Sequence, residues 1–104
     1  MSEVQLSARA RLEIRAAGRW YLAQSPQTAK RFLQAVDVLL GRIGTSPRLW
    51  RVHGKSARRA PIPRFPYSIY YQEVGDTVYV LAVVHAHRHP DAWRQAGDEA
   101  AHTD

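Results

Sequence analysis

The feature that most constrains the fold is a pair of alternating runs joined by Gly75-Asp76. Every second residue is apolar from Tyr67 to Tyr71 and again from Val78 to Val84. Alternation of this kind predicts β-strands, and a two-residue Gly-Asp loop between two such runs is typical of a tight antiparallel hairpin. The second run is also apolar at its intervening positions, so we expect it to be a central strand covered on both faces.

The short loop also predicts the register of the hairpin, provided that Val74 lies opposite Thr77. The pairs that follow are Tyr71 with Val80, Ile69 with Ala82, and Tyr67 with Val84. We expect this face to pack against helices, because one-sided apolar patterning marks the buried face of a sheet. The reverse face is then expected to carry Ser68, Tyr70, Tyr79, Leu81, Val83 and His85. Either the chain itself or a partner would cover it.

Two helices are predicted ahead of the hairpin. Ser7 can cap a helix over residues 8–24, and Ser25-Pro26 starts a second helix that stops at Gly44. The connection is so short that the helices should form an antiparallel hairpin. The first helix is expected to bury Leu12, Ala16, Ala17 and Trp20. The second is expected to bury Ala29, Phe32, Leu33, Val36, Leu39, Leu40 and Ile43.

Two shorter segments complete the predicted sheet. Val4 and Leu6 alternate with polar residues and indicate a first strand. Residues 58–64 are interpreted as a strand at an edge, where the missing N–H groups of Pro61 and Pro63 would face outward. The element order predicts an α+β fold in which a helical hairpin packs on a small, mainly antiparallel β-sheet. We expect one domain over residues 1–95 and a flexible C-terminal tail over residues 96–104.

Charge narrows the classes of partner. The formal net charge of +6 and the isoelectric point of about 10.3 favour contact with nucleic acid, an acidic protein or a membrane surface. Seven Lys or Arg residues and no acid lie from Arg42 to Arg64, interleaved with Trp50 and His53. Such a segment can bind phosphates and stack on bases. The alternative is a solvated, arginine-rich surface with Trp50 in the core.

Cellular location is constrained by what the chain lacks. It has no cysteine, and it begins without a basic, apolar leader. The apolar run at residues 79–84 is far too short to span a bilayer. We therefore expect a cytoplasmic protein with no disulfide and no membrane association.

The segment from His85 to His89 contains three histidines at alternate positions, with Arg88 between the last two. Histidines at this spacing can bind a metal. No cysteine and no suitably placed carboxylate accompanies them, so we expect no metal and no other cofactor. A general acid or base role is favoured, because histidine titrates near neutral pH. A polar strand end is the plain alternative.

Several segments, by their order and spacing, resemble the RelE/ParE superfamily of toxins from type II toxin–antitoxin systems. Within residues 4–94 they are Ala8–Leu12, Ser25-Pro26 with Ala29 and Phe32, Ser46-Pro47, Arg64–Tyr71, Gly75-Asp76, Val80–Arg88 and Trp93-Arg94. The resemblance implies a toxin held in check by a cognate antitoxin that lays a helix or strand across it. It also implies one of two activities. RelE-like members cleave mRNA on the ribosome without metal, whereas ParE-like members poison DNA gyrase.

The residues that RelE-like nucleases use are matched unevenly. Arg88 stands where those members keep a catalytic arginine, but Ser68 occupies the position of their other arginine. Of their basic residues on the preceding strand, only one is kept, near Arg59. The segment Phe65-Pro66-Tyr67 together with His85 is more similar to the ParE-like branch, which we favour.

The candidate site residues form three groups. The catalytic candidates are Arg88, His85, His87 and Arg59. The residues expected to bind the target or nucleic acid are Arg51, His53, Lys55, Arg58, Arg64, Trp93 and Arg94. The residues expected to bind the antitoxin are Tyr70, Tyr79, Leu81 and Val83.

Three functions follow as hypotheses. The first is a toxin that arrests growth by inhibiting an essential target, DNA gyrase, and that forms a hetero-oligomer with its antitoxin. The second is a metal-independent, ribosome-dependent mRNA endoribonuclease that uses Arg88, a histidine and Arg59. The third is a basic binding module without toxicity.

Overall fold

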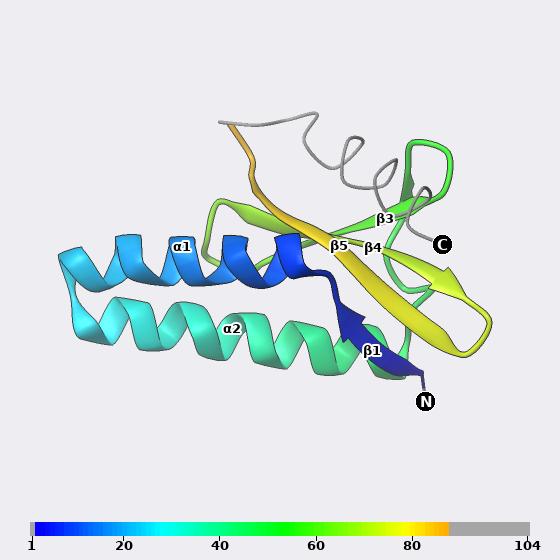
Figure 1. Cartoon of the computed structure of the whole chain (residues 1–104), viewed down its shortest axis with the longest axis horizontal. Coiled ribbons are helices and arrows are strands. Elements are labelled where there is room, and N and C mark those ends of the chain that lie inside the picture. The colour runs from blue at the N-terminus through cyan, green and yellow to red at the C-terminus, as the bar shows by residue number, and fades with distance from the viewer. Residues whose placement is uncertain (1, 88–104) are drawn as a thin grey trace.

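Two antiparallel helices lie against one face of a five-stranded sheet in the computed structural model, which describes residues 2–87 (Figure 1). In chain order the elements are β1 (Glu3–Leu6), α1 (Ala8–Gln24), α2 (Pro26–Thr45), β2 (Val52–His53), β3 (Ala57–Pro61), β4 (Tyr67–Val74) and β5 (Thr77–His85). The strand order is β1-β5-β4-β3-β2, with β1 parallel to β5 and all other neighbours antiparallel. The predicted α+β class, a helical hairpin on a mainly antiparallel sheet, is confirmed.

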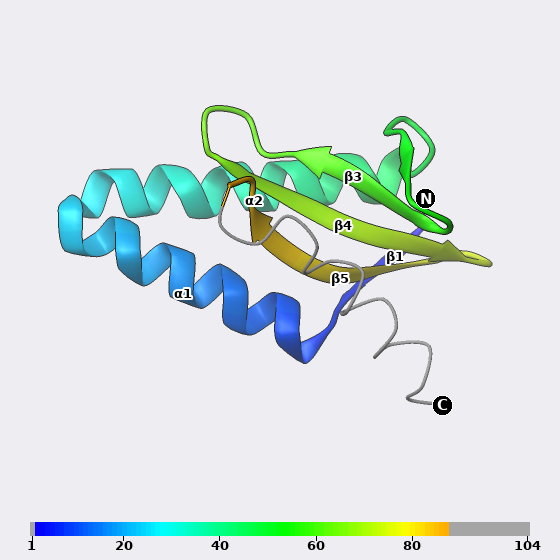
Figure 2. The same ribbon diagram turned by 90° about the horizontal axis from the view of Figure 1, so that it is seen from above.

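Both helices begin at the predicted serines. The Ser7 hydroxyl accepts a hydrogen bond from the Ala10 N–H at 3.0 Å, and the Ser25 hydroxyl accepts one from the Thr28 N–H at 3.4 Å. These bonds satisfy N–H groups that a helix start leaves without partners. Figure 2 shows both helices on one side of the sheet, with α1 nearer β5 and α2 nearer β3. Within residues 2–87, neither helix is long and apolar enough to cross a membrane.

The predicted buried face of α2 is largely confirmed, whereas that of α1 is confirmed only at Ala17. On α2, Leu33 departs from the prediction because it is 47% exposed. On α1, the other predicted residues, Leu12, Ala16 and Trp20, are exposed, and Ala10, Gly18 and Tyr21 are buried together with Ala17. Small residues let α1 approach α2 closely, so they select the face that packs, and Trp20 is left on the outside.

The hairpin register is confirmed near the turn and wrong farther from it. Val74 pairs with Thr77 and Tyr71 with Val80, and Gly75 at the turn has a φ of +58°. Beyond Tyr71 the pairing shifts by one residue. Ile69 therefore lies opposite Val83 rather than Ala82, and Tyr67 lies opposite His85 rather than Val84.

A β-bulge at Leu81 causes this shift. Leu81 has no partner on β4, because Tyr70 pairs with Ala82 and Tyr71 with Val80. The extra residue switches the faces of every later side chain on β5. Ala82 and Val84, predicted to face the helices, instead cluster with Leu81 and Tyr70 on the opposite face. Conversely, Val83 packs in the core beneath the helices, contrary to its predicted position on the reverse face.

The start of α1 closes the edge of β5 that β1 leaves open. The Ser7 N–H donates to the Val80 carbonyl, and the Ser7 hydroxyl donates to the Leu81 carbonyl, both at 3.0 Å. In the second turn of α1, a Glu13 carboxylate oxygen accepts a hydrogen bond from the Val83 N–H at 3.0 Å. Because these groups satisfy the backbone around the bulge, this edge offers no free row of donors for strand addition.

At the opposite edge of the sheet, β3 is shorter than predicted, because it ends at Pro61. The two residues of β2 pair with Ala57 and Arg58, so β2 covers only the start of β3. The Ile62 N–H points inward to the Tyr67 carbonyl at 2.9 Å. Since strand backbones alternate, the missing N–H of Pro61 falls on the outer side, as the sequence predicted.

Candidate functional site

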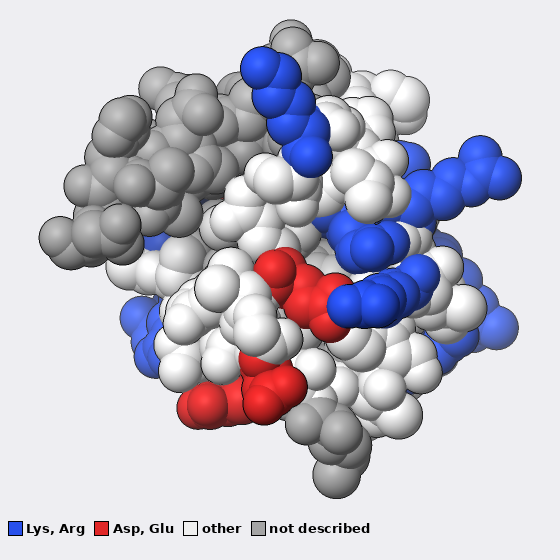
Figure 3. All heavy atoms as spheres, turned by 90° about the vertical axis from the view of Figure 1, so that its right-hand side faces the viewer, with Lys and Arg blue, Asp and Glu red and all other residues white. Residues whose placement is uncertain are grey.

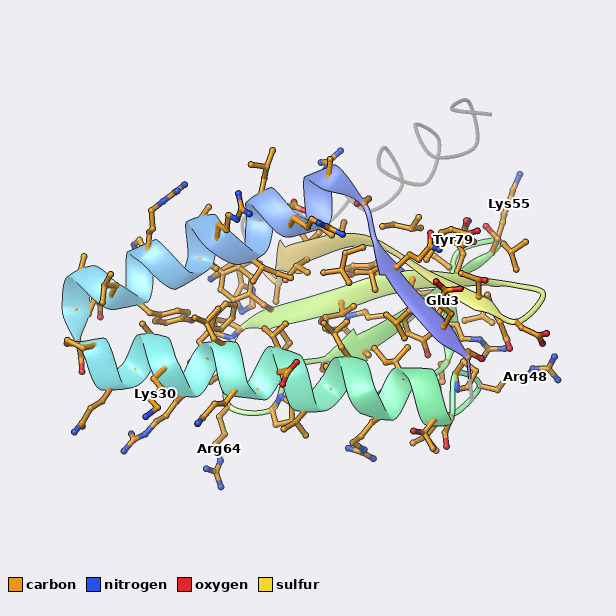
Figure 4. All side chains as sticks on the ribbon, turned by 60° about the horizontal axis from the view of Figure 1, so that its bottom comes forward. Glu3, Lys30, Arg48, Lys55, Arg64 and Tyr79 are labelled. Carbon is orange, nitrogen blue, oxygen red and sulfur yellow. The ribbon has the colours of Figure 1, made fainter. Side chains whose placement is uncertain are left out.

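The basic segment from Arg42 to Arg64 does not form a single surface. Figure 4 shows Lys55 and Arg48 at one end of the molecule and Arg64 beside α2, well away from them. At the first end, the Arg48 guanidinium lies 3.3 Å from a carboxylate oxygen of Glu73. Figure 3 shows acidic side chains beside Lys and Arg on this face. Arg51 and Lys55 are exposed here, but the local charge is mixed.

Two of the residues in the basic segment are engaged in holding the fold. A guanidinium N–H of Arg58 donates to the Trp50 carbonyl at 2.7 Å. The Trp50 ring is half-buried against the core, and the Arg42 guanidinium lies 5.3 Å from the ring centre. Trp50 therefore has the core role that the sequence left open, stabilised by a cation–π contact. Its indole is not a free stacking surface.

The reverse face of the sheet, away from the helices, carries most of the residues expected to bind the antitoxin. Tyr70 and Leu81 belong to its buried cluster, and alternation along β5 places Tyr79 on the same face with 40% of its surface exposed. The His53 ring lies 5.9 Å from the Tyr70 ring, and Arg59 pairs with Tyr70 across the strands. Val83 is the exception, because the bulge turns it into the core.

His85 lies on the helix side of the sheet, so its predicted place on the reverse face is wrong. Its ring lies 5.1 Å from that of Tyr67 and 6.0 Å from that of His87. Its Nδ1 accepts a hydrogen bond from the His87 N–H at 3.1 Å. Arg59, by strand alternation, projects from the opposite face. The structure therefore separates Arg59 from His85 by the thickness of the sheet.

Three of the candidate site residues and the predicted tail cannot be placed on the fold. Arg88, Trp93, Arg94 and the predicted tail over residues 96–104 all lie outside residues 2–87. Within residues 2–87, no group of three or more His, Asp or Glu side chains could hold a metal ion.

The structure instead places His85 at a cleft that sequence reasoning missed. Trp20, Tyr21, Phe65 and Arg64 share its walls. The ring centres of Tyr21 and Phe65 are 5.2 Å apart in an edge-to-face arrangement, and those of Trp20 and Tyr21 are 5.1 Å apart. Helix α1 contributes the rings of Trp20 and Tyr21, and the β3–β4 loop contributes that of Phe65. Because these segments are far apart in the sequence, no local motif predicts the cleft.

Arg64 has an unusual backbone conformation in that loop. Its φ is +71°, within the left-handed region that favours glycine. The Phe65 N–H donates to the Ile62 carbonyl at 3.3 Å and closes a four-residue turn with Pro63 and Arg64 at its centre. Proline at the second position and a positive φ at the third match a type II turn, whose third residue is usually glycine. The arginine is therefore kept at a cost in backbone energy.

We expect Arg64→Gly to raise the free energy of unfolding by roughly 0.5–1 kcal/mol, because relief of the left-handed strain exceeds the extra freedom of glycine in the unfolded chain. Urea denaturation would show a higher midpoint with an unchanged slope. Arg64→Ala is the matched control, since it removes the guanidinium but keeps a Cβ in the strained region. A glycine variant no more stable than the alanine variant would contradict the assignment of strain.

The fold and these surfaces define a class of small, basic α+β protein in which a helical hairpin covers one face of a sheet and the other face carries an apolar cluster. The family model described as the ParE toxin of type II toxin–antitoxin system, parDE, matches residues 4–90. The chain therefore belongs to the ParE toxin family, and the predicted resemblance to RelE/ParE toxins, with the ParE-like branch favoured, is confirmed.

A solved structure described as the chromosomal ParDE TA system from P. aeruginosa is similar to this chain. The TM-score is 0.63 at 15% sequence identity, and the match covers 82% of this chain and 96% of that one. At this identity, the likeness supports the fold alone. The comparison with curated proteins finds no match.

Proposed function

We propose that this protein is the toxin of a toxin–antitoxin pair, acts in the cytoplasm and arrests growth by inhibiting DNA gyrase. A cognate antitoxin neutralises it by forming a hetero-oligomer. The family match over residues 4–90 carries the proposal, because it extends over both helices and all five strands.

Gyrase is favoured over mRNA as the target by the arrangement of the catalytic candidates. Metal-independent RNA cleavage needs a base, an acid and a phosphate-stabilising cation around the same phosphodiester. Arg59 and His85 project from opposite faces of the sheet, and Ser68, at the position of a nuclease arginine, is buried. Two members of the catalytic set therefore cannot reach the same phosphodiester.

Two measurements on the same induced culture test this proposal. Induction without the antitoxin should relax plasmid supercoiling or leave cleaved DNA, while mRNA at the ribosome stays intact. Purified toxin should inhibit supercoiling by purified gyrase, and addition of the antitoxin from the adjacent gene should restore it. Normal supercoiling with cleaved mRNA would overturn the choice of target, and normal growth on induction would overturn the toxin assignment.

The antitoxin is proposed to dock on the reverse face of the sheet at Tyr79, beside the cluster that contains Tyr70 and Leu81. The Tyr79 ring is exposed on the reverse face and lies on β5, between β1 and β4. Tyrosines at interface centres often dominate binding, because they bury a large apolar area with few rotatable bonds.

We expect Tyr79→Ala to weaken antitoxin binding by about tenfold or more, measured by isothermal titration calorimetry. Leu12→Ala is the control, because Leu12 is also exposed but lies on α1 and not on the sheet. Equal losses in both variants would contradict docking at Tyr79.

A further inference from the structure

Two hollows meet at Arg64 and Phe65, on the side of the molecule formed by the helices and the β3–β4 loop. The first is the aromatic cleft that reaches Trp20 and His85, with a volume of about 620 Å³. The second is a groove of about 650 Å³ between the same loop and α2, reaching Arg31 and Arg42. Both volumes lie in the range of pockets that bind small molecules or single groups of a polymer. We call them the aromatic cleft and the arginine groove.

The aromatic cleft has the chemistry of a stacking site. Trp20 is 49% exposed, so part of its ring surface faces solvent, whereas Tyr21 and Phe65 are packed into the fold behind it. Edge-to-face packing of Tyr21 against Phe65 holds these rings in place before any ligand arrives. A fixed, partly exposed ring beside other aromatic walls is what an unpaired nucleobase requires, because every base has a flat face to stack.

The arginine groove has an excess of positive charge over an apolar floor. Arg31, Arg42 and Arg64 line it, together with Val38 and Leu39, and no acidic residue does. Within residues 2–87, no ion pair is recorded for Arg31 or Arg64. Figure 4 shows the Arg64 side chain extending outward beside α2. The guanidiniums of Arg31 and Arg64 are available to an anionic polymer, and planar guanidiniums bind phosphate oxygens in pairs.

Arg64 connects the two hollows. Its strained backbone is a further observation, independent of the lining residues, that indicates a ligand-binding surface. It lines both the cleft and the groove, at the third position of a turn where glycine would relieve strain. Strained positions that keep a charged side chain concentrate at functional sites, because the surrounding fold otherwise gains by relaxing them. The turn thus fixes one cation at the boundary between a stacking site and a row of cations.

We propose that this surface binds a single strand of nucleic acid, with one unpaired base in the aromatic cleft and the adjoining phosphates on Arg64 and the arginine groove. A base pair would hide the face that Trp20 needs, so a duplex is disfavoured. An acidic peptide would pair with the arginines but leave the stacking site without an occupant. The chemistry is shared by DNA and RNA, since neither the cleft nor the groove shows a dedicated contact for a 2′-hydroxyl.

Fluorescence anisotropy with the full-length protein tests the proposal. The probes are labelled mixed-sequence strands of about ten nucleotides, as DNA and as RNA, together with a hairpin duplex of the DNA sequence. At about 50 mM salt, we expect saturable binding of the single strands and at least roughly tenfold weaker binding of the duplex. Binding of either single strand supports the site, and the ratio of their affinities reports the contribution of the sugar.

Three variants assign the binding to this surface. Trp20→Ala should weaken binding roughly five- to a hundredfold, and Trp20→Phe should recover most of the loss, because a phenyl ring still stacks. Arg64→Gly should weaken binding and lower the salt-dependence slope by about 0.7, although it is the more stable protein. Arg11→Ala removes the same charge from the exposed side of α1 and should change affinity by no more than about twofold.

Several results would overturn the proposal. No saturable binding of either single strand would do so, as would a duplex that binds as tightly as the single strand. Equal losses in Arg11→Ala and Arg64→Gly would show that net charge alone is responsible. An acidic helical peptide that binds in a manner sensitive to Trp20→Ala, with no binding of the strands, would assign the surface to a protein partner instead.

Discussion

Phe32→Ala is expected to lower the free energy of unfolding by about 3–5 kcal/mol. Phe32 is fully buried on α2, and its ring centre lies 5.2 Å from that of Tyr21, 5.2 Å from that of Phe65 and 5.6 Å from that of Tyr67. Removal of the ring leaves a cavity between α1, α2 and the sheet that these rigid elements cannot close. Domains of this size are stable by only about 5–15 kcal/mol, so urea denaturation should show a large fall in midpoint.

Leu33→Ala is the matched control, since Leu33 is the next residue on α2 and is 47% exposed. It should cost less than about 1 kcal/mol, because little apolar surface is removed from contact. The Phe32 variant should also bind the labelled single strands less tightly under conditions where it is still folded, because Phe65 and the Arg64 turn lose their support. Similar losses of stability in both variants would show that the aromatic cluster does not hold the two layers together.

Much of the fold could be predicted because the helix starts and the hairpin turn are determined by local chemistry. Ser7 and Ser25 cap the helices through their own hydroxyls, and Gly75 adopts the positive φ that a tight turn requires. Each of these residues acts within three or four positions in the chain, so its role can be read without knowledge of the tertiary structure.

The bulge at Leu81 could not be predicted in the same way. Alternation reveals register only when one face is polar, and every residue from Val78 to Val84 is apolar. The bulge depends on contacts made by residues seventy or more positions away, where Ser7 and Glu13 satisfy the backbone of β5. The predicted orientation of Val83 failed for this reason.

The candidate site was harder to predict than the fold. Helical spacing predicts that Trp20 shares a buried face with Leu12 and Ala16, but Ala17 and Gly18 give α1 a closer packing face. Pro63 was a usable signal, since proline at the second position of a turn favours a positive φ at the next residue. The meeting of Trp20 with Phe65 depends on how α1 crosses the β3–β4 loop, which no local pattern encodes.

The structure separates two proposed interactions onto the two faces of the sheet. Tyr79 lies on the reverse face, where the antitoxin is proposed to dock, whereas Trp20 and Arg64 lie on the side of the helices. Variants at Tyr79 should therefore change antitoxin affinity and leave binding of single strands unchanged, and Trp20 variants should do the reverse. Such independence is expected for sites that share no residues.

Tyr71 should make the protein less stable in alkaline solution. Its ring is fully buried on β4, and its hydroxyl donates to the Pro47 carbonyl at 2.7 Å. Burial raises the pKa of Tyr71 to about 12, an effect that Arg58 opposes and Glu73 reinforces. Between the ordinary pKa of about 10 and this value, the folded chain retains a proton that the unfolded chain releases. Stability from this group is therefore complete below about pH 10 and declines as pH rises to about 12.

The expected loss from Tyr71 is about 1.4 kcal/mol by about pH 11 and roughly 2–3 kcal/mol once pH exceeds 12. Urea midpoints measured at intervals from about pH 8 to pH 11 would reveal it as a difference between the protein and Tyr71→Phe. The variant cannot ionise at this position, so other titrating groups cancel in the comparison. It should be less stable near neutral pH by about 1 kcal/mol, because the Pro47 carbonyl loses its donor. The two stability curves should therefore converge as pH rises, and parallel curves would mean that Tyr71 ionises equally easily in both states.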